Sequence, residues 1–236
     1  MKHQPMEKPL VNKLNQIFAT EKTTSGRLQA LIASPVVLAA VVLALALWPR
    51  VTDLGVFVGP DEFYWLTGSV NFIEALRTGD LAKTYHAGQP GVTLMWAEAI
   101  GAGGRYVGHL LGAPGGQTVL VDEKSMPMLE LGRQVAAVAN ALLLVVIVLQ
   151  VRAIFGSGVA WLAGFLLAFD AFFLTESRAL RTESFVTSFN TVALLTILLY
   201  LRKPRPWLSA VIGLTIGLAL LSKVSALALV PVGLLV

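Results

Sequence analysis

Long apolar stretches recur along this chain, and they restrict its possible folds more than any other feature. Each of them approaches the roughly 20 residues that a helix needs to cross a bilayer. The sequence is 56% hydrophobic and only 14% charged, with a mean hydropathy of +0.72, which lies outside the range of ordinary soluble domains. We therefore expect an all-α polytopic membrane protein with spans at residues 30–48, 134–151, 159–174, 185–201 and 207–221, and a sixth span beginning at 225.

The two ends of the chain suggest its organisation. Residues 1–29 are polar, and no small-residue cleavage site follows the first apolar stretch, so we expect a retained cytoplasmic leader rather than a removed signal peptide. Residues 30–236 form the expected transmembrane domain. Because the sequence stops inside the sixth apolar stretch, we expect it to be an N-terminal fragment of a longer domain. The chain contains no cysteine, so it has no disulfide, thiolate ligand or thiol nucleophile.

Basic residues predict the orientation of the spans. Five Lys or Arg residues precede the first span against two Glu residues, which favours a cytoplasmic N-terminus. Arg152, after the second span, and the R-K-P-R turn at 202–205, after the fourth, agree with that orientation. Residues 49–133 then form a long outer loop with nine acidic residues against six Lys or Arg. We expect a multi-pass protein of the plasma membrane with its active site on the outer face.

The outer loop is expected to carry two amphipathic helices that lie on the membrane surface. Residues 61–77 place apolar side chains at the spacing of one helix face, and residues 92–111 form a second apolar helix. Between them lies a turn-rich loop that holds Tyr85 and His86, and residues 112–128 are rich in Gly and Pro. The apolar face of the first helix comprises Phe63, Leu66, Val70, Ile73 and Leu76.

Two adjacent carboxylates, Asp61 and Glu62, open the first of these helices. A carboxylate at the membrane surface could act as a general base toward a bound hydroxyl group. Alternatively, the pair only stabilises the positive N-terminal end of the helix after Pro60, an effect of about 0.3–1 kcal/mol. Tyr64 and His86 are candidate substrate contacts, although a His in a Gly- and Pro-containing loop is more often a turn residue.

Three cations are expected in short outer loops, where the usual distribution of basic residues disfavours them. Arg178 and Arg181 lie between the third and fourth spans, and Lys223 lies at the outer end of the fifth. They could bind a lipid-linked phosphate at headgroup level. Alternatively, they snorkel or pair with Glu176 and Glu183. The basic residues neither form a stripe nor alternate with aromatic residues, so we expect no nucleic-acid partner.

Four short motifs resemble those of GT-C membrane glycosyltransferases, most closely glycosyltransferase family 39. This family includes the protein O-mannosyltransferases and the aminoarabinose transferases that act on lipid A. The order and spacing of the motifs carry the resemblance, which extends from about residue 30 onward. The motifs are D-E at 61–62, H-A-G-Q-P-G at 86–91, S-R-A-L-R-T-E at 177–183 and G-L-A-L-L-S-K at 217–223. The chain departs from the family in the expanded His-Pro-Pro loop and in a Glu at 183 where many relatives have Asp.

The resemblance implies a GT-C-like helix bundle that transfers a sugar from a polyprenyl-phosphate carrier to a protein or glycolipid hydroxyl, with inversion. Asp61, Glu62 and Glu183 would be the catalytic carboxylates, and Arg178, Arg181 and Lys223 would bind the donor phosphate. No cofactor is certain. By analogy, Asp61 and Glu183 could hold a divalent metal ion, although two residues do not define a metal site. Glu183 could instead be a first-turn acid or a partner for Arg181.

Two other classes of protein remain open. A secondary transporter would also have several spans with intramembrane charges, but its acids would lie near the midplane of broken helices in repeated halves. Here the charges lie at the outer rim, and no internal repeat is present. A catalytically inactive GT-C-like scaffold would explain the spans but not an acidic pair facing three cations.

Overall fold

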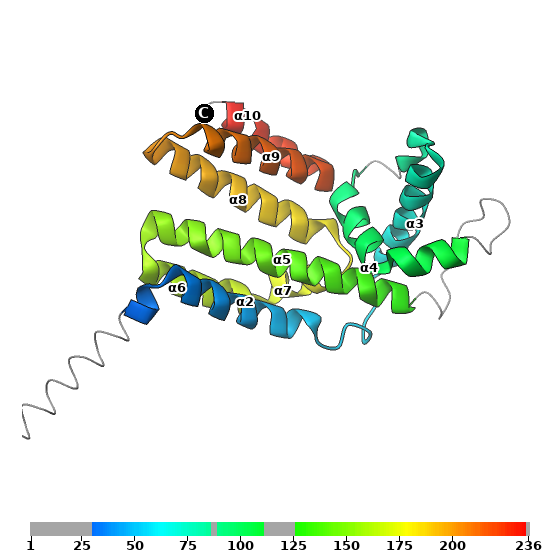
Figure 1. Ribbon diagram of the computed structural model, residues 1–236, viewed down its shortest axis with the longest axis horizontal. Coiled ribbons are helices and arrows are strands. Elements are labelled where there is room, and N and C mark those ends of the chain that lie inside the picture. The colour runs from blue at the N-terminus through cyan, green and yellow to red at the C-terminus, as the bar shows by residue number, and fades with distance from the viewer. Residues whose placement is uncertain (1–29, 86–88, 111–125, 235–236) are drawn as a thin grey trace, which may run out of the picture.

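The computed structural model describes residues 30–85, 89–110 and 126–234, of which 102–110 are described by their backbone alone. These residues are almost entirely helical, and no strand occurs among them. Figure 1 shows the principal helices running side by side as a bundle, while α3 stands across one end. The elements are α2 (Pro35–Val51), α3 (Glu62–Thr78), η1 (Leu81–Thr84), α4 (Val92–Leu110), α5 (Met126–Phe155), α6 (Ser157–Phe169), α7 (Ala171–Arg178), α8 (Thr182–Arg202), α9 (Pro206–Ser222), η3 (Val224–Leu229) and α10 (Val230–Leu234).

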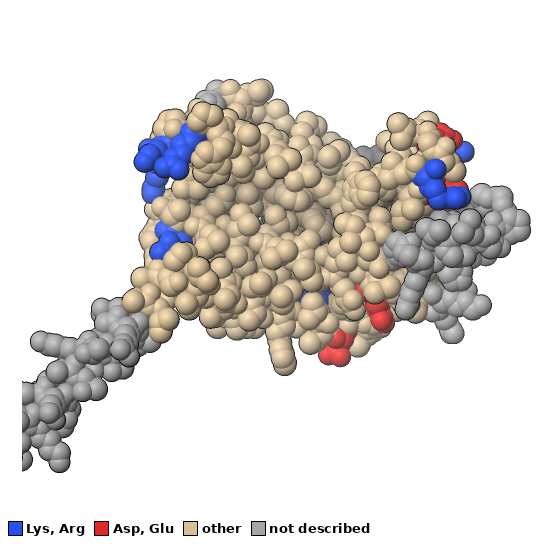
Figure 2. Space-filling view, in the orientation of Figure 1, with Lys and Arg blue, Asp and Glu red and all other residues tan. Residues whose placement is uncertain are grey.

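The bundle is built around α5. This 30-residue helix packs against α2, α4, α6 and α8, and α8 packs along α9. Small side chains such as Ala141 and Ala160 allow α2, α5 and α6 to approach closely around Leu38, Val42 and Leu144. In Figure 2, the bundle between its two ends presents a broad surface with almost no charged side chains, as a protein in contact with lipid does.

The predicted spans all coincide with helices, but not all are long enough to cross a bilayer by themselves. Two described helices, α5 and α8, have the length and composition of a membrane span. The pair α6 and α7 would make a third if it is one span bent by 59°. Helices α2 and α9 have 17 residues each. The all-helical class and the membrane character are therefore confirmed, and the complete set of six spans stays a prediction.

The first helix differs from its predicted bounds. Residues 30–33 are helical as predicted, but the helix is interrupted at Ser34, and α2 begins at Pro35, where Ser34 caps it by accepting a hydrogen bond from the Val37 amide at 3.4 Å. It also continues through Pro49 to Val51, so the predicted end at residue 48 is wrong. A proline in the last turn removes only one backbone donor from the helix.

The third predicted span is broken at Asp170, which the hydropathy pattern does not reveal. Its carboxylate caps α7 by accepting a hydrogen bond from the Phe173 amide at 2.7 Å. The side chain is exposed, so this acid has a local structural role at the bend between α6 and α7.

Arg50 also stabilises this bend, and its side chain is fully buried. Its guanidinium donates hydrogen bonds to the Ala168 carbonyl at 3.1 Å, at the C-terminal end of α6, and to the Ser177 hydroxyl of α7 at 2.8 Å. It also lies 5.2 Å above the Phe173 ring. A cation is favoured at a helix C-terminus, where carbonyl groups have no partner within the helix. Arg50 therefore fixes the direction in which α7 leaves α6.

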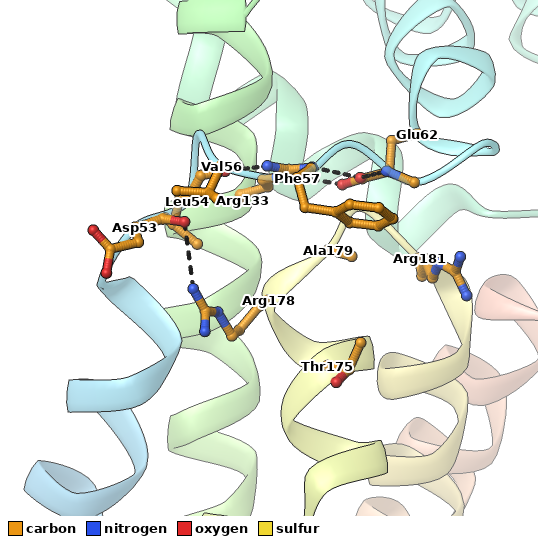
Figure 3. A pocket seen from close by; sticks show the side chains of 11 residues that line it. Asp53, Leu54, Val56, Phe57, Glu62, Arg133, Thr175, Arg178, Ala179 and Arg181 are labelled. Carbon is orange, nitrogen blue, oxygen red and sulfur yellow. Dashed lines mark hydrogen bonds and ion pairs between the residues drawn. The ribbon is translucent and has the colours of Figure 1, made fainter.

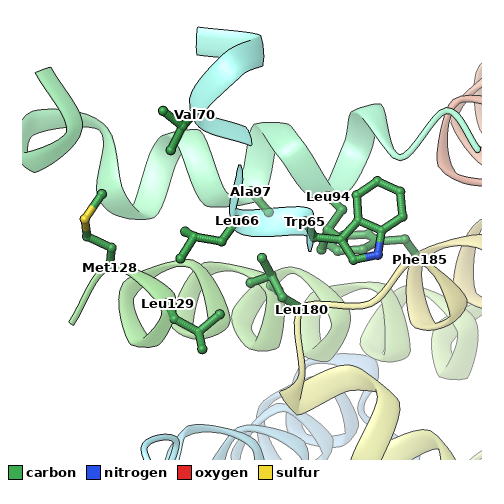
Figure 4. Close-up of a cluster of buried hydrophobic side chains, with 10 residues drawn as sticks. Trp65, Leu66, Val70, Leu94, Ala97, Met128, Leu129, Leu180 and Phe185 are labelled. Carbon is green, nitrogen blue, oxygen red and sulfur yellow. The ribbon is translucent and has the colours of Figure 1, made fainter. Parts of the chain in front are cut away.

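Both helices predicted within residues 49–133 are present. Helices α3 and α4 match the predicted ranges to within one residue at each end. The buried face of α3 is rotated from the predicted one, because Trp65 is buried whereas Leu76 is 38% exposed. The last eight residues of the predicted outer loop (126–133) instead form the first turns of α5. Figure 4 shows the hydrophobic cluster that joins these elements, with Trp65, Leu66, Val70, Leu94, Ala97, Met128, Leu129, Leu180 and Phe185 labelled.

Gly91 allows the chain to enter α4 directly beside this cluster. Its φ is +60°, a conformation that side chains disfavour, and a Cβ at this position would lie 1.9 Å from the Trp65 ring. The Gly91 amide donates to the Ser222 carbonyl at 3.1 Å, which ties the start of α4 to the end of α9.

Candidate active site

A cavity of about 490 Å³ opens at the end of the bundle that carries α3. The segment between α2 and α3 forms one wall, and α7 with the turn that follows it forms another (Figure 3). Three arginines line this cavity, so we name it the cationic cavity. It is lined by Asp53, Leu54, Val56, Phe57, Gly59, Glu62, Arg133, Thr175, Arg178, Ala179 and Arg181.

Glu62 and Arg133 form a buried ion pair in the wall of this cavity. Arg133 Nε lies 2.8 Å from Glu62 Oε1, and Arg133 Nη2 lies 2.5 Å from Glu62 Oε2. Glu62 also accepts the backbone amides of Gly59 at 2.5 Å and Leu180 at 2.7 Å. Both carboxylate oxygens are therefore engaged by donors from three separate segments.

Arg133 completes this arrangement from α5. Besides Glu62, it donates to the carbonyls of Leu54 and Phe57, so a single guanidinium holds the segment that leads into α3. Sequence reasoning did not single out this residue. The only indication of it in the sequence is that an arginine stands just before the predicted second span. Its partner Glu62 lies 71 residues earlier in the chain.

Arg178 and Arg181, both predicted to bind phosphate, line the same cavity (Figure 3). Arg178 donates to the Thr52 carbonyl at 2.5 Å and has no carboxylate partner among the described residues. Arg181 pairs with Glu176 at 3.0 Å, and 29% of its side chain is exposed. A guanidinium has five N–H donors, so each arginine keeps donors that these contacts do not use.

Asp61 lies next to the cationic cavity, between two residues that line it, Gly59 and Glu62. Its side chain is exposed and makes no capping hydrogen bond at the start of α3. Within the described part of the chain, its carboxylate has no hydrogen-bond or ion-pair partner. Tyr64, on the same turn of the helix, is 44% exposed with its ring against Trp65. His86 lies outside the described residues.

Lys223, the third cation predicted to bind phosphate, pairs with an acid that does not line the cationic cavity. Its ammonium lies 2.5 Å from Glu183 Oε1, and it does not line the cationic cavity. The alternative prediction is that these cations pair with Glu176 and Glu183. It agrees with two ion pairs of the structure, Arg181 with Glu176 and Lys223 with Glu183. The expected alternative partner of Glu183 was Arg181, and in the structure it is Lys223.

The described residues contain no group of three or more His, Cys, Asp or Glu side chains that could hold a metal ion. Glu183, one of the two predicted metal ligands, receives Lys223 on one oxygen and lies 3.3 Å from the Thr182 hydroxyl through the other. Glu183 is therefore occupied by donors of the protein in this structure, and the predicted pairing of Asp61 with Glu183 around an ion stays a hypothesis.

Comparison with known proteins supports the predicted resemblance for the second half of the chain. Residues 129–236 match the model of a family described as dolichyl-phosphate-mannose-protein mannosyltransferase. The match includes Arg133, Arg178, Arg181, Glu183 and Lys223 and begins after the Asp61–Glu62 pair. No curated protein and no solved structure matches the chain. The chain therefore resembles membrane glycosyltransferases of the GT-C type.

Proposed function

We propose that the protein transfers a sugar from a polyprenyl-phosphate carrier to a hydroxyl of a protein or glycolipid acceptor, at the outer face of the plasma membrane. The observation that carries this proposal is a carboxylate without a partner among the described residues, Asp61, beside a cavity lined by three arginines. The matched family supports it, because its description names a lipid-phosphate-linked mannose and a protein acceptor.

Asp61 is the proposed general base. As the acceptor oxygen attacks the anomeric carbon, Asp61 takes the hydroxyl proton, and the bond from that carbon to the phosphate oxygen breaks. Attack opposite the leaving group inverts the anomeric configuration. The exposed carboxylate of Asp61 is available for this role, since it makes no capping hydrogen bond.

Arg178 and Arg181 are the proposed donor-phosphate ligands. The departing phosphate keeps the electron pair of the broken bond and gains negative charge, which fixed cations stabilise in a site of low dielectric. Phosphate is a weak base, so this step needs no general acid. Arg178 has no carboxylate partner in the described chain, which leaves its charge available to the carrier.

Glu62, Glu183 and Lys223 take supporting roles in this proposal. Glu62 accepts hydrogen bonds from Gly59, Arg133 and Leu180, which engage both of its carboxylate oxygens. Its proposed role is therefore to position the loop that carries Asp61, and not to take the proton of the substrate hydroxyl. Glu183 and Lys223 hold each other near the start of α4, because Ser222, next to Lys223, accepts a hydrogen bond from the Gly91 amide. The exposed Tyr64 of α3 is a proposed substrate contact. No step of this mechanism requires a metal ion at Asp61 and Glu183.

The test is transfer of radiolabelled sugar from polyprenyl-phosphate carriers by the purified full-length protein. Asp61→Asn should remove transfer and leave membrane insertion unchanged, because the amide cannot take the proton. Asp80→Asn is the matched control, since Asp80 is a partly exposed acid of the same predicted outer segment that pairs only with the exposed Lys83 in the described chain. Transfer retained by Asp61→Asn would contradict the assignment of the base, and no transfer by the wild type with any carrier would favour the inactive-scaffold or transporter alternatives.

A further inference from the structure

A second cavity, of about 310 Å³, lies between α5, α7 and α8. Carboxylates line one part of it, α8 supplies hydroxyl groups, and leucine, isoleucine and phenylalanine side chains line the rest. We name it the acidic groove after its three acids, Asp170, Glu176 and Glu183.

We propose that the acidic groove binds a bilayer phospholipid whose headgroup carries a primary ammonium group. The proposal does not depend on the glycosyltransferase function. It rests on the position of the groove, on the chemistry of its walls and on a buried carboxylate oxygen that has no donor.

The groove lies where lipid chains can reach it. Two of the helices that form it, α5 and α8, have the length and composition of membrane spans. Phe172, which lines the groove, is 72% exposed, and Thr187 is also exposed, so the groove opens at the lateral surface of the bundle. Leu144 and Ile147 supply an apolar wall on α5 that suits an acyl chain.

The opposite wall is a stripe of hydroxyl groups on α8. Ser184, Thr187, Ser188 and Thr191 are spaced three or four residues apart, so they share one helix face. Asn140 contacts two of them, with Ser184 at 3.1 Å and Ser188 at 3.3 Å, which fixes the inner part of the stripe. The exposed Thr187 remains at the opening, where a bound lipid would pass.

Glu176 gives the groove its specificity for a hydrogen-bond donor. Only 6% of this residue is exposed, and Oε1 pairs with Arg181 at 3.0 Å. Oε2 has no hydrogen-bond partner among the described residues. A buried acceptor without a donor is unfavourable by about 1–3 kcal/mol, so a ligand that supplies an N–H group gains affinity here.

The charges around the groove favour a cationic group over an anionic one. Glu176 and Glu183 each pair with one cation, Arg181 and Lys223 respectively. Asp170 has no cationic partner in the described chain and accepts only the backbone amide of Phe173. The nearby cation Arg50 lies against the Phe173 ring and donates to carbonyls and to the Ser177 hydroxyl, so it does not pair with Asp170. An ammonium group therefore complements both Asp170 and the unsatisfied oxygen of Glu176.

Phosphatidylethanolamine and phosphatidylcholine provide a direct test, because both are zwitterionic and only the first has N–H donors. Native mass spectrometry of the purified full-length protein, titrated with each lipid at matched acyl chains, should show about tenfold stronger retention of phosphatidylethanolamine, the ratio that corresponds to about 1.4 kcal/mol. Equal retention of the two lipids would overturn the proposal and indicate nonspecific bulk lipid, with water satisfying Glu176.

Two variants locate the binding site. Glu176→Gln should abolish the preference for phosphatidylethanolamine, with Glu74→Gln as control, since Glu74 also accepts hydrogen bonds from an arginine, Arg77, but is distant from the groove in sequence and fold. Thr187→Phe should reduce retention of both lipids by filling the opening, and it leaves all three carboxylates in place. Leu194→Phe is its control, an exposed residue of the same helix that does not line the groove. Unchanged retention in Thr187→Phe would overturn the assigned location.

Discussion

The cationic cavity and the acidic groove carry opposite charge, yet the same short helix contributes to both. Helix α7 places Thr175 and Arg178 in the cationic cavity and Phe172 and Glu176 in the acidic groove. The Arg181–Glu176 ion pair joins the two, since Arg181 lines the cavity and Glu176 lines the groove. One short stretch of sequence thus contributes acids to the groove (Asp170, Glu176 and Glu183) and bases to the cavity (Arg178 and Arg181).

The two regions also differ in how their charges are held. In the wall of the cavity, the buried Glu62–Arg133 pair has backbone and side-chain partners for both carboxylate oxygens. In the groove, Glu176 keeps one oxygen without a donor in the described chain. Satisfied buried charges hold a structure rigid, whereas an unsatisfied one favours a ligand. This difference separates the positioning residues from the binding residues.

The largest expected effect is that of Arg133→Ala. This variant changes the cationic cavity and not the acidic groove, which Arg133 does not line. Glu62 would remain buried and charged without its partner, a change that typically destabilises a protein by about 3–5 kcal/mol. We expect a lower midpoint of unfolding in SDS titrations followed by circular dichroism. Arg77→Ala is the control, because its pair with Glu74 on α3 is exposed. A midpoint equal to that of the wild type would show that the pair does not support the fold.

Arg50→Met should affect both regions at once, because Arg50 fixes the direction of α7. The variant removes charge-assisted hydrogen bonds worth about 1.5–3 kcal/mol each and leaves the last carbonyls of α6 without a donor. We expect both the affinity for the polyprenyl-phosphate carrier and the preference for phosphatidylethanolamine to fall. Arg205→Met, in the exposed turn between α8 and α9, is the control. Loss of only one of the two readouts would show that α7 does not couple the regions.

Local patterns in the sequence predict much of this fold, but they do not predict which charged side chains come together. The positions of α3, α4, α8 and α9 follow from hydropathy and from helix spacing, which are properties of neighbouring residues. The bend at Asp170 depends on Arg50, which lies 118 residues from the Ala168 carbonyl that it binds. No periodicity encodes a contact of that separation.

The candidate site shows the same limit. The motifs drew attention to Asp61 and Glu62 as a pair, but their environments differ completely: one side chain is exposed and the other is fully buried. Which of two neighbouring carboxylates is buried depends on Arg133 and on the Leu180 amide, both distant in sequence. The sequence also grouped Lys223 with Arg178 and Arg181, whereas the fold pairs it with Glu183.

Arg178→Ala should affect the cationic cavity without changing the groove. Arg178 has no carboxylate partner in the described chain, so its removal does not leave an acid without its ion-pair partner. We expect affinity for the carrier to fall about tenfold, or about 1.4 kcal/mol, while lipid preference stays at the wild-type value. Lys83→Ala, which removes an exposed cation of η1, should leave both unchanged. Wild-type carrier affinity in Arg178→Ala would remove this arginine from the proposed phosphate site.

Lys223→Ala should give the smallest effect and is the most informative about the boundary of the phosphate site. Its pair with Glu183 is partly exposed, with 26% and 40% of the two side chains accessible, and such pairs contribute about 0–1 kcal/mol. Because Lys223 does not line the cationic cavity, carrier affinity should fall less than in Arg178→Ala when the two are measured side by side. A loss as large as that of Arg178→Ala would mean that Lys223 leaves Glu183 to bind the phosphate. The cavity would then extend to α9, and Glu183, released from its cation, would become available to the acceptor.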